Sequence, residues 1–300
     1  MTTRRNVLMG LAAMPLAHRA WAAQTVTLGA RTVTTLSDGN LTLPADFLFG
    51  GLPEAELSEI LARHGIPQDQ VEPPCNVTLM RHGDRIVLFD AGSGPAFMQS
   101  AGRLPGALEA AGLAPGDVTD VIFTHGHPDH LWGVLDDFDE PLFYNATYHF
   151  GRTEWDYWRD PDTVDTIGEA RAAFAVGAQR RMDAIEAACE FFDAGDEVLP
   201  GVMAHASFGH TPGHMSYEIR DGSESLMVVG DAIVNGHVAF ERPEWPSGSD
   251  QDQDMGIKTR QRLLDQLATD RMRMIGFHLP GGGIGRVERA DGAYRFVTEG

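Results

Sequence analysis

The sequence of 300 residues predicts an α/β protein in which packed sheets are covered by outer helices. Strand-like apolar runs dominate both halves of the chain, and helical patterns are interspersed among them, which is the mixture expected of this class. Four of the strand-like runs end in Asp or His and lead into a polar or glycine-rich loop. Loops at strand ends are the common place for chemistry in such folds.

The N-terminal half is predicted to contain mostly strands and one helix. Two strands over 24–43 are separated by the turn signal Asp38-Gly39-Asn40, and residues 76–94 form a hairpin that turns at Gly83-Asp84. A helix over 53–65 carries its apolar side chains on one face and ends at Gly65. A further strand over 117–125 ends on a histidine cluster.

The C-terminal half is predicted to alternate between helices and strands. Residues 168–192 are mostly helical, 202–211 and 216–231 are strands, 257–270 form a helix and 273–278 form a short strand. No low-complexity linker and no fixed repeat separates these patterns in the sequence. We therefore expect residues 23–300 to form one domain.

Charge and composition narrow the kinds of partner. Hydrophobic residues make up 43% and charged residues 22%, which is ordinary for a globular protein, but the net charge of −20 is not. So acidic a chain repels phosphate backbones, which argues against nucleic-acid binding. The sequence after residue 22 contains no apolar stretch of membrane-spanning length. A small-molecule substrate is the expected partner, and the oligomeric state stays open.

Residues 1–22 read as an export signal. Arg4 and Arg5 precede an interrupted apolar stretch, and small residues lie at Ala20 and Ala22. The adjacent arginines resemble a twin-arginine signal, and an ordinary secretory signal is the alternative. Either signal predicts a periplasmic or otherwise exported protein. An oxidising compartment would permit Cys75 and Cys189 to pair, although two separate buried thiols explain them as well.

The stretch "FTHGHPDH" concentrates metal-binding side chains. It places His125 and His127 two residues apart, and Asp129 and His130 follow at the start of the next predicted helix. If the strand pattern continues to His127, both imidazoles leave the same side of the backbone and converge on one ion. Imidazole and carboxylate ligands suit zinc, and also iron or manganese.

Three later segments offer matching ligands. "FGHTPGH" carries His210 and His214 in a Gly/Pro turn, "LMVVGDAI" ends a buried-looking strand in Asp231, and "MIGFHLPGGGIG" ends another at His278. Solvated residues would not be expected to follow an apolar run in four separate segments. The sequence therefore predicts a site for two metal ions.

These motifs, in this order and together with Asp90 in "LFDAGSG", resemble the metallo-β-lactamase superfamily. The resemblance implies a four-layer αβ/βα sandwich with two divalent ions, zinc first and iron or manganese as alternatives, at one edge of the sheets. It also implies a role for each matching residue. The first ion would be bound by His125, His127 and His210, the second by Asp129, His130 and His278, and both by Asp231, with Asp90 and His214 supporting the ligands.

The resemblance also implies a reaction. Two cations lower the pKa of a shared water, which attacks an ester-like substrate while Asp129 orients it and moves its proton to the leaving group. "NATYHFGRTEWDYW" and "HLPGGGIGRV" look like segments of the lactonase and methyl-parathion-hydrolase-like branch. A lactone or carboxylic ester is therefore expected, with a phosphotriester as an alternative. The run Gly281-Gly282-Gly283 departs from that branch, where an aromatic residue is usual.

Candidate substrate contacts are less specific. Residues 241–256 are too polar and Pro-rich for a core, so they form either a substrate-side loop or a plain surface loop. On the first interpretation, Phe240 and Trp245 are the apolar contacts. The aromatic residues of 155–158 line the pocket or, equally well, pack an amphipathic helix on the core.

Two other functional classes fit the same ligands. A mononuclear iron oxidoreductase of the persulfide dioxygenase type uses the same fold with one iron. A non-catalytic periplasmic accessory protein would keep the ligands for structure alone. The metal content of the purified protein separates them, because two zinc ions per chain favour hydrolysis and one iron favours dioxygenation.

The twin-arginine interpretation makes a prediction about export. Replacing Arg4 and Arg5 together by Lys should leave the precursor in the cytoplasm, since that route recognises the arginine pair. Cell fractionation followed by immunoblotting measures the distribution, and Arg19→Lys serves as a matched control. Unchanged export of the double variant would contradict the interpretation.

Overall fold

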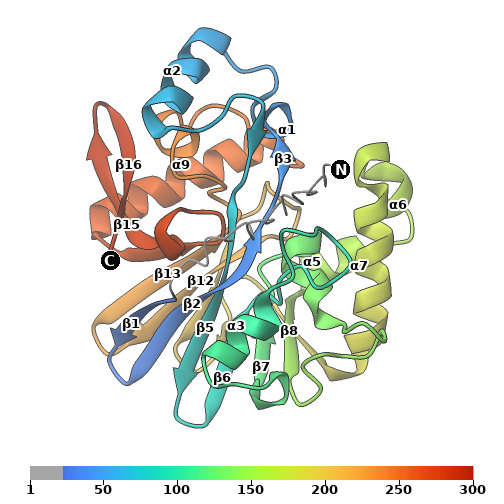
Figure 1. Cartoon of the computed structure of the whole chain (residues 1–300). Helices are drawn as coiled ribbons and strands as arrows, with labels where there is room; N and C mark the ends of the chain where they lie inside the picture. Colours follow the sequence, from blue (N-terminus) through green and yellow to red (C-terminus); the bar gives the residue numbers. More distant parts are fainter. Residues whose placement is uncertain (1–22, 300) are drawn as a thin grey trace, which may run out of the picture.

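The computed structural model describes residues 23–299 and shows two stacked sheets with helices on both outer faces (Figure 1). The predicted export signal, residues 1–22, lies outside the described residues. Within 23–299, none of the helices combines the length and apolarity needed to cross a bilayer.

The first sheet has seven strands in the order β1-β2-β5-β6-β7-β8-β9. Its N-terminal strands pair antiparallel, whereas β6 to β9 pair parallel. The bounds are β1 Gln24–Leu28, β2 Arg31–Asn40, β5 Pro74–His82, β6 Arg85–Phe89, β7 Asp120–Ile122, β8 Thr147–Gly151 and β9 Cys189–Phe192.

The second sheet also has seven strands, in sequence order from β10 to β16. All its neighbours pair antiparallel except β13 and β14, which run parallel. The bounds are β10 Glu197–Leu199, β11 Val202–Ala206, β12 Met215–Asp221, β13 Glu224–Gly230, β14 Arg273–Gly276, β15 Ile284–Ala290 and β16 Ala293–Thr298.

Helices connect the strands and cover the sheets. The α-helices are α1 Ala45–Phe49, α2 Glu54–His64, α3 Leu104–Ala110, α4 Pro128–Leu131, α5 Arg152–Arg159, α6 Thr163–Thr166, α7 Ala172–Ile185, α8 Val238–Glu241 and α9 Gln253–Asp270. Short 3₁₀ helices are η1 Pro115–Asp117, η2 Trp132–Val134, η3 Glu169–Arg171, η4 Glu186–Ala188 and η5 Gly281–Gly283.

Alternation along the strands produces the layers. In β5, Leu79 faces the core beneath α3, α5 and α7, whereas the next residue, Met80, faces the core between the sheets. In β13, Val228 joins the core between the sheets and Met227 packs beneath α9. Successive strand residues point to opposite faces, so both sheets are apolar on both sides. The result is the predicted four-layer αβ/βα sandwich.

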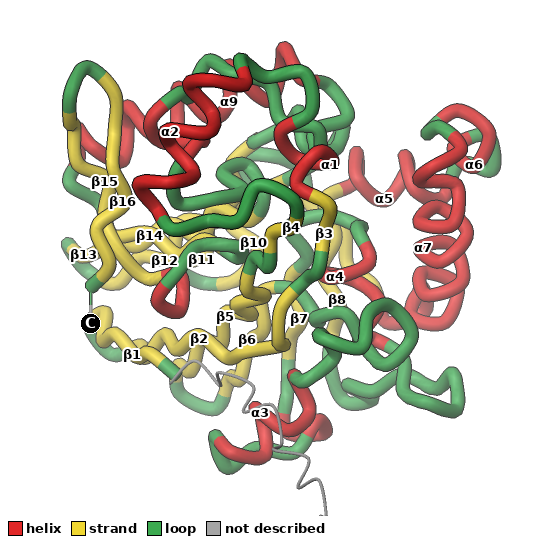
Figure 2. Tube along the Cα trace, turned by 45° about the horizontal axis from the view of Figure 1, so that its top comes forward, coloured by secondary structure: helices red, strands yellow, loops and turns green. Residues whose placement is uncertain are grey.

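A small lobe, which we call the N-terminal lobe, comprises residues 41–72 and packs on one end of the sandwich (Figures 1 and 2). It holds α1, α2 and a two-stranded sheet of β3 Leu43–Pro44 and β4 Gln70–Val71. Its own apolar cluster includes Leu48 and Ile60, and partly buried Trp245 packs against it. Helix α2 ends as predicted at Gly65, which has φ of +66°.

The predicted turn at Asp38-Gly39-Asn40 was wrong. Asp38-Gly39-Asn40 is not a turn, because β2 continues through it and the first hairpin turns at Gly29-Ala30. The Asp38 carboxylate is buried and accepts backbone N–H groups of Ser93, Gly102 and Leu104, while the pairing register shifts beside Gly39. The signal therefore marks a bulge. Residues 168–192 are mostly helical, as predicted, from η3 through η4, and the last four residues, Cys189–Phe192, pair with β8 as β9.

The hairpin of residues 76–94 was predicted correctly. Strands β5 and β6 pair antiparallel with His82 opposite Arg85, which leaves Gly83-Asp84 as a two-residue turn. The second strand ends immediately before Asp90. The hairpin thus delivers Asp90 to the same end of the first sheet at which β7 ends, since β6 and β7 run parallel.

Candidate metal centre

The predicted ligands come together at one edge of the sandwich. His125 and His127 lie in the loop after β7, and His210 lies in the loop between β11 and β12. Asp231 and His278 follow β13 and β14, which are parallel, so both side chains emerge at the same sheet edge. The strand pattern does not continue to His127, as β7 ends at Ile122; a loop brings the imidazoles together instead.

Three imidazoles form the first donor cluster. Nδ1 of His127 lies 2.9 Å from Nε2 of His125 and 2.9 Å from Nε2 of His210. All three residues are buried. A single ring nitrogen has one proton or one lone pair, so Nδ1 of His127 cannot hydrogen-bond well to both neighbours. A cation between the three lone pairs satisfies all of them.

Two carboxylates and two imidazoles form the second donor cluster. Nε2 of His278 lies 3.2 Å from Oδ2 of Asp129 and 3.2 Å from Oδ2 of Asp231. Nε2 of His130 lies 3.4 Å from Oδ2 of Asp129 and 3.3 Å from Oδ1 of Asp231. Oδ2 of Asp231 is also 3.4 Å from Nε2 of His210. Asp231 therefore connects the two clusters, as a bridging ligand must.

The residues fit divalent metal binding. Among residues 23–299, three buried atoms that face the second cluster find no hydrogen-bond partner: Oδ2 of Asp129, Nε2 of His130 and Oδ1 of Asp231. Unpaired buried polar atoms are costly, and so many in one place indicate an ion. Imidazole nitrogen and carboxylate oxygen are ligands for zinc, iron and manganese, and they do not distinguish among these metals.

Electrostatics differ between the two clusters. Burial, followed by the neighbouring imidazoles, lowers the pKa of His125 and His127 well below the usual value, so both rings are neutral and offer lone pairs. Burial also lowers the pKa of His130, but the charges of Asp129, Asp231 and Asp90 outweigh it, and the net direction is upward. The negative charges that favour the protonated form of His130 would also favour a metal cation at the same position.

Asp90 orients the loop that carries His125 and His127, and it contacts this loop on the side away from the donor atoms. Its carboxylate accepts the N–H of Thr124 at 2.7 Å, the Thr124 hydroxyl at 2.8 Å and Nδ1 of His130 at 2.7 Å. Nδ1 of His125 lies 3.0 Å from the same hydroxyl. The Nδ1 atoms of both histidines are thus occupied, which leaves Nε2 of each ring free for a metal. The structure thus places Asp90 behind the ligand rings, and its supporting role stays a prediction.

His214 holds the backbone of Asp231 and joins neither donor cluster. Its Nε2 accepts the backbone N–H of Asp231 at 3.0 Å, and its Nδ1 lies 2.8 Å from the Ser207 hydroxyl. Gly230 has φ of +54°, and a Cβ atom there would lie 2.7 Å from Nε2 of His214. The glycine before Asp231 is therefore required for this close approach.

Two further side chains at the centre were not predicted. Asp250 is buried, and Oδ1 of its carboxylate lies 3.2 Å from Nδ1 of His210. The acidic stretch around it gave no sign which carboxylate turns inward. Cys75 is buried with its sulfur within 4.8 Å of the donor atoms of Asp129 and His278. Within the described chain both cysteines are free thiols, as in the second alternative, but only Cys75 is buried and Cys189 is partly exposed.

An apolar cavity of about 240 Å³ opens on the donor clusters. Its floor includes His127, Asp129, His210, Asp231 and His278. Leu41, Leu43, Phe47 and Leu48 contribute the wall from the N-terminal lobe, and Phe97, Met98 and Phe174 contribute it from the sandwich. Arg171 is the charged residue on this wall. The site therefore combines buried metal-binding groups with space for an apolar group beside them.

The predicted substrate contacts do not line this cavity. Phe240 is fully buried beneath α9, and Trp245 packs against the N-terminal lobe. Sequence showed that both are apolar neighbours of a polar loop, but not which way they face. From that loop Ser249 lines the cavity instead. Trp155 and Trp158 are buried in the core, which agrees with the packing interpretation of residues 155–158.

The α/β sandwich and its buried histidine–carboxylate centre define a metallo-hydrolase. The chain belongs to the metallo-beta-lactamase superfamily, whose family model matches residues 71–275. The N-acyl homoserine lactonase AttM of Agrobacterium fabrum is 30% identical over 127 residues, which are 42% of this chain and 45% of that protein. The match to AttM thus spans less than half of either protein.

Solved structures are similar over nearly the whole chain. The dizinc quorum-quenching lactonase AidC superposes with a TM-score of 0.87 at 26% identity, covering 93% of this chain and 97% of AidC. The hydrolase AbOPH gives a TM-score of 0.86 at 27% identity, with the same coverage of 93% and 97%. The predicted metallo-β-lactamase fold is confirmed by these likenesses.

The bridging position of Asp231 generates a prediction. Asp231→Ala removes the carboxylate that offsets repulsion between two cations, so the variant should lose at least one metal per chain. Removal of a group that only supports a ligand typically costs 10–100-fold in metal affinity, and loss of a bridging ligand should cost more. Elemental analysis after dialysis measures the stoichiometry, with Asp221→Ala as the control. If the Asp231 variant still binds two metal ions per chain, the assignment of Asp231 as a metal ligand is contradicted.

Proposed function

We propose that the protein is a dinuclear metal-dependent hydrolase that cleaves lactones or carboxylic esters carrying an apolar acyl group. The observation that carries this proposal is the apolar cavity, because it opens directly on both donor clusters. If the scissile carbonyl lies at the donor clusters, the acyl chain attached to it lies against the apolar wall of the cavity. AidC and AttM are lactonases, which supports the same substrate class for this chain.

We propose zinc for both ions, supported by the dizinc description of AidC. The first ion would be held by His125, His127 and His210, the second by Asp129, His130 and His278, and both by Asp231, as the two donor clusters suggest. Bound divalent cations would lower the pKa of a shared water and polarise the substrate carbonyl.

Asp129 is the proposed proton carrier. It lies at the start of α4, lines the cavity and is buried beside His278. Its carboxylate can accept the proton of the attacking water and deliver it to the alkoxide oxygen that leaves the acyl carbon. In a lactone that oxygen stays attached to the same molecule, so the product retains both a carboxylate and a hydroxyl group.

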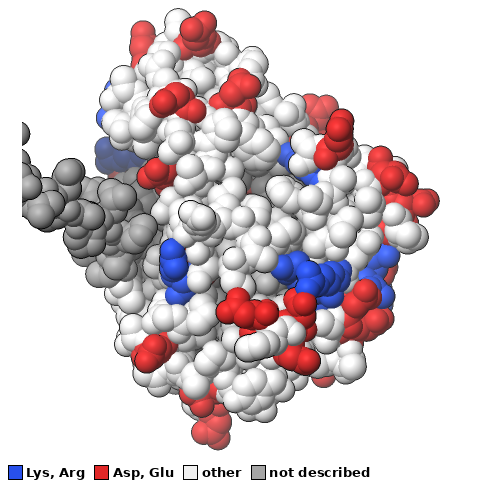
Figure 3. Space-filling view, turned by 45° about the vertical axis from the view of Figure 1, so that its right-hand side comes forward, with Lys and Arg blue, Asp and Glu red and all other residues white. Residues whose placement is uncertain are grey.

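The charge distribution supports a substrate without net negative charge. Acidic side chains are spread over the face in Figure 3, with fewer arginines among them, and the whole chain carries −20. Such a surface slows the approach of polyanions, although salt at about 0.1 M screens charges beyond roughly 10 Å. An uncharged lactone or ester avoids this repulsion.

We also propose that the protein is exported. The adjacent residues Arg4 and Arg5, at the start of the predicted signal, support this proposal.

The hydrolase proposal predicts a defined set of activities. Zinc- or manganese-loaded protein should cleave N-acyl homoserine lactones or aryl esters, and Asp129→Asn should abolish turnover by removing the proton acceptor. Acid release and chromophore release measure the two substrates. Oxygen consumption with glutathione persulfide, one iron per chain and no ester cleavage would support the dioxygenase class instead. Full metal content without turnover of any of these substrates would support an accessory protein.

The apolar wall predicts a preference for longer acyl chains. Each added methylene that reaches the wall contributes about 0.8 kcal/mol, which is roughly fourfold in KM. Phe174→Ala should raise KM for a long-chain lactone about tenfold and leave a short-chain lactone nearly unchanged, because only the long chain contacts this ring.

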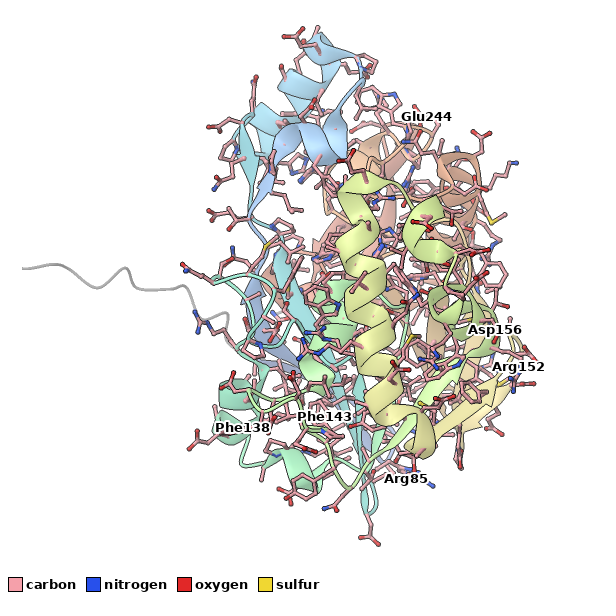
Figure 4. All side chains as sticks on the ribbon, turned by 90° about the vertical axis from the view of Figure 1, so that its right-hand side faces the viewer. Arg85, Phe138, Phe143, Arg152, Asp156 and Glu244 are labelled. Carbon is pink, nitrogen blue, oxygen red and sulfur yellow. The ribbon has the colours of Figure 1, made fainter. Side chains whose placement is uncertain are left out.

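Phe138→Ala is the matched control for this series. Phe138 is 84% exposed and lies between the bridged residues Leu135 and Pro141. Figure 4 labels it at the lower left of the molecule. It should change neither value of KM. Equal KM values for short and long chains in the unaltered protein would contradict an acyl-binding role for the cavity.

A further inference from the structure

The carboxylate of Glu154 lies where α5 meets the two loops that carry the first donor cluster. It is only 1% exposed, and four donors surround it. Oε1 accepts the backbone N–H of Gly126 at 2.9 Å and the indole N–H of Trp158 at 2.6 Å. Oε2 accepts the hydroxyl of Thr211 at 2.7 Å and the backbone N–H of Gly213 at 2.9 Å. Each carboxylate oxygen therefore accepts two hydrogen bonds, one for each of its lone pairs.

The two oxygens hold different ligand loops. Gly126 lies between His125 and His127, so Oε1 fixes the loop that carries both of these histidines. Thr211 directly follows His210, so Oε2 fixes the loop that carries the third imidazole. One rigid carboxylate thus sets the distance between the two halves of the three-histidine cluster. A charged acceptor with four short hydrogen bonds is a strong support for backbone.

Close packing supports the same conclusion independently. A Cβ atom on Gly126 would lie 2.4 Å from the Trp158 indole nitrogen, and one on Gly213 would lie 2.2 Å from the backbone nitrogen of Glu154. Both loops therefore approach α5 more closely than any side chain would permit. The glycines concerned are the same two residues whose N–H groups bond to Glu154.

The orientation of α5 makes this contact possible. Arg152 and Asp156, one turn apart, lie at the outer edge of the molecule in Figure 4. Glu154 and Trp158 are likewise four residues apart and occupy the buried face. The Trp158 ring lies 5.6 Å from the His127 ring, centroid to centroid, so this face also confines that imidazole.

The second donor cluster is supported by other groups. Nδ1 of His130 bonds to Asp90, and Nδ1 of His278 lies 2.8 Å from the carbonyl oxygen of Pro74. Asp231 is held by His214 through its backbone N–H. Within residues 23–299, none of these supporting contacts involves Glu154. Glu154 therefore supports the loops of the three-histidine cluster, whereas the rings of His130 and His278 are held by other groups.

We propose that Glu154 is a positioning residue that fixes the spacing of the two histidine loops and thereby sets the metal affinity of the three-histidine cluster. The proposal rests on the metal centre of the proposed function but not on its substrate. Glu154 lies within the segment "NATYHFGRTEWDYW", but the sequence alone did not single it out, because its burial depends on contacts across the fold.

Glu154→Gln tests the proposal with a side chain of the same size. Whichever way the new amide is oriented, its NH₂ group faces one of the two backbone N–H groups, which cannot turn away. One loop is then released. Chelator competition with Zn²⁺ should show one of the two dissociation constants raised 10–100-fold, with the other changed by less than about threefold. The readout is metal binding alone, so it holds even if no lactone is cleaved.

Glu218→Gln is the matched control, because Glu218 is also buried but bonds to His205 and Arg220 on the second sheet. It should leave both constants unchanged. Thr211→Val removes one of the four hydrogen bonds and should weaken the same constant by a smaller factor, which keeps the test valid if the glutamine variant does not fold. Unchanged constants in Glu154→Gln and Thr211→Val, or equal weakening of both constants, would overturn the proposal.

Discussion

Convergence of lone pairs inside the protein is the constraint on which the rest of the structure depends. Five imidazoles and two carboxylates point toward two shared positions, and several of their atoms have no partner within the described residues. Nitrogen atoms held 2.9 Å apart, such as those of His127 and His210, do not attract each other as neutral acceptors. The protein must therefore hold these atoms in place at a cost in free energy that only a bound cation would offset. A rigid framework is needed to do so.

The framework acts through the opposite ends of the ligands. Thr124, Asp90, Asp250 and the carbonyl of Pro74 each engage the Nδ1 atom of a histidine, which fixes the ring and directs Nε2 inward. His214 fixes Asp231 in a different way, by accepting a hydrogen bond from its backbone N–H. These supports come from several strands and loops, so the centre has the correct shape only when both sheets are stacked. We therefore expect metal binding and folding to be coupled in this protein.

Sequence predicted the parts of this site that depend on local pattern. The spacing from His125 to His130 and the ligands at strand ends are properties of short segments, and the structure brings all seven predicted ligands together. Asp38-Gly39 was misread because a turn signal and a bulge have the same residues, and only the contacts of the buried carboxylate distinguish them. Asp250 was missed and Phe240 was misplaced for a related reason: distant elements decide which side chains in and beside a polar loop are buried.

The cavity and the metal centre are built from different parts of the chain. The metal-binding groups come from the sheet edges of the sandwich, whereas Leu41, Leu43, Phe47 and Leu48 come from the N-terminal lobe. None of these four apolar side chains supports a metal-binding group through a hydrogen bond, and their contribution is shape and apolar area. Substitution in the lobe can therefore alter which acyl group fits without disturbing the ligands, and the separation follows from the layer order rather than from any single residue.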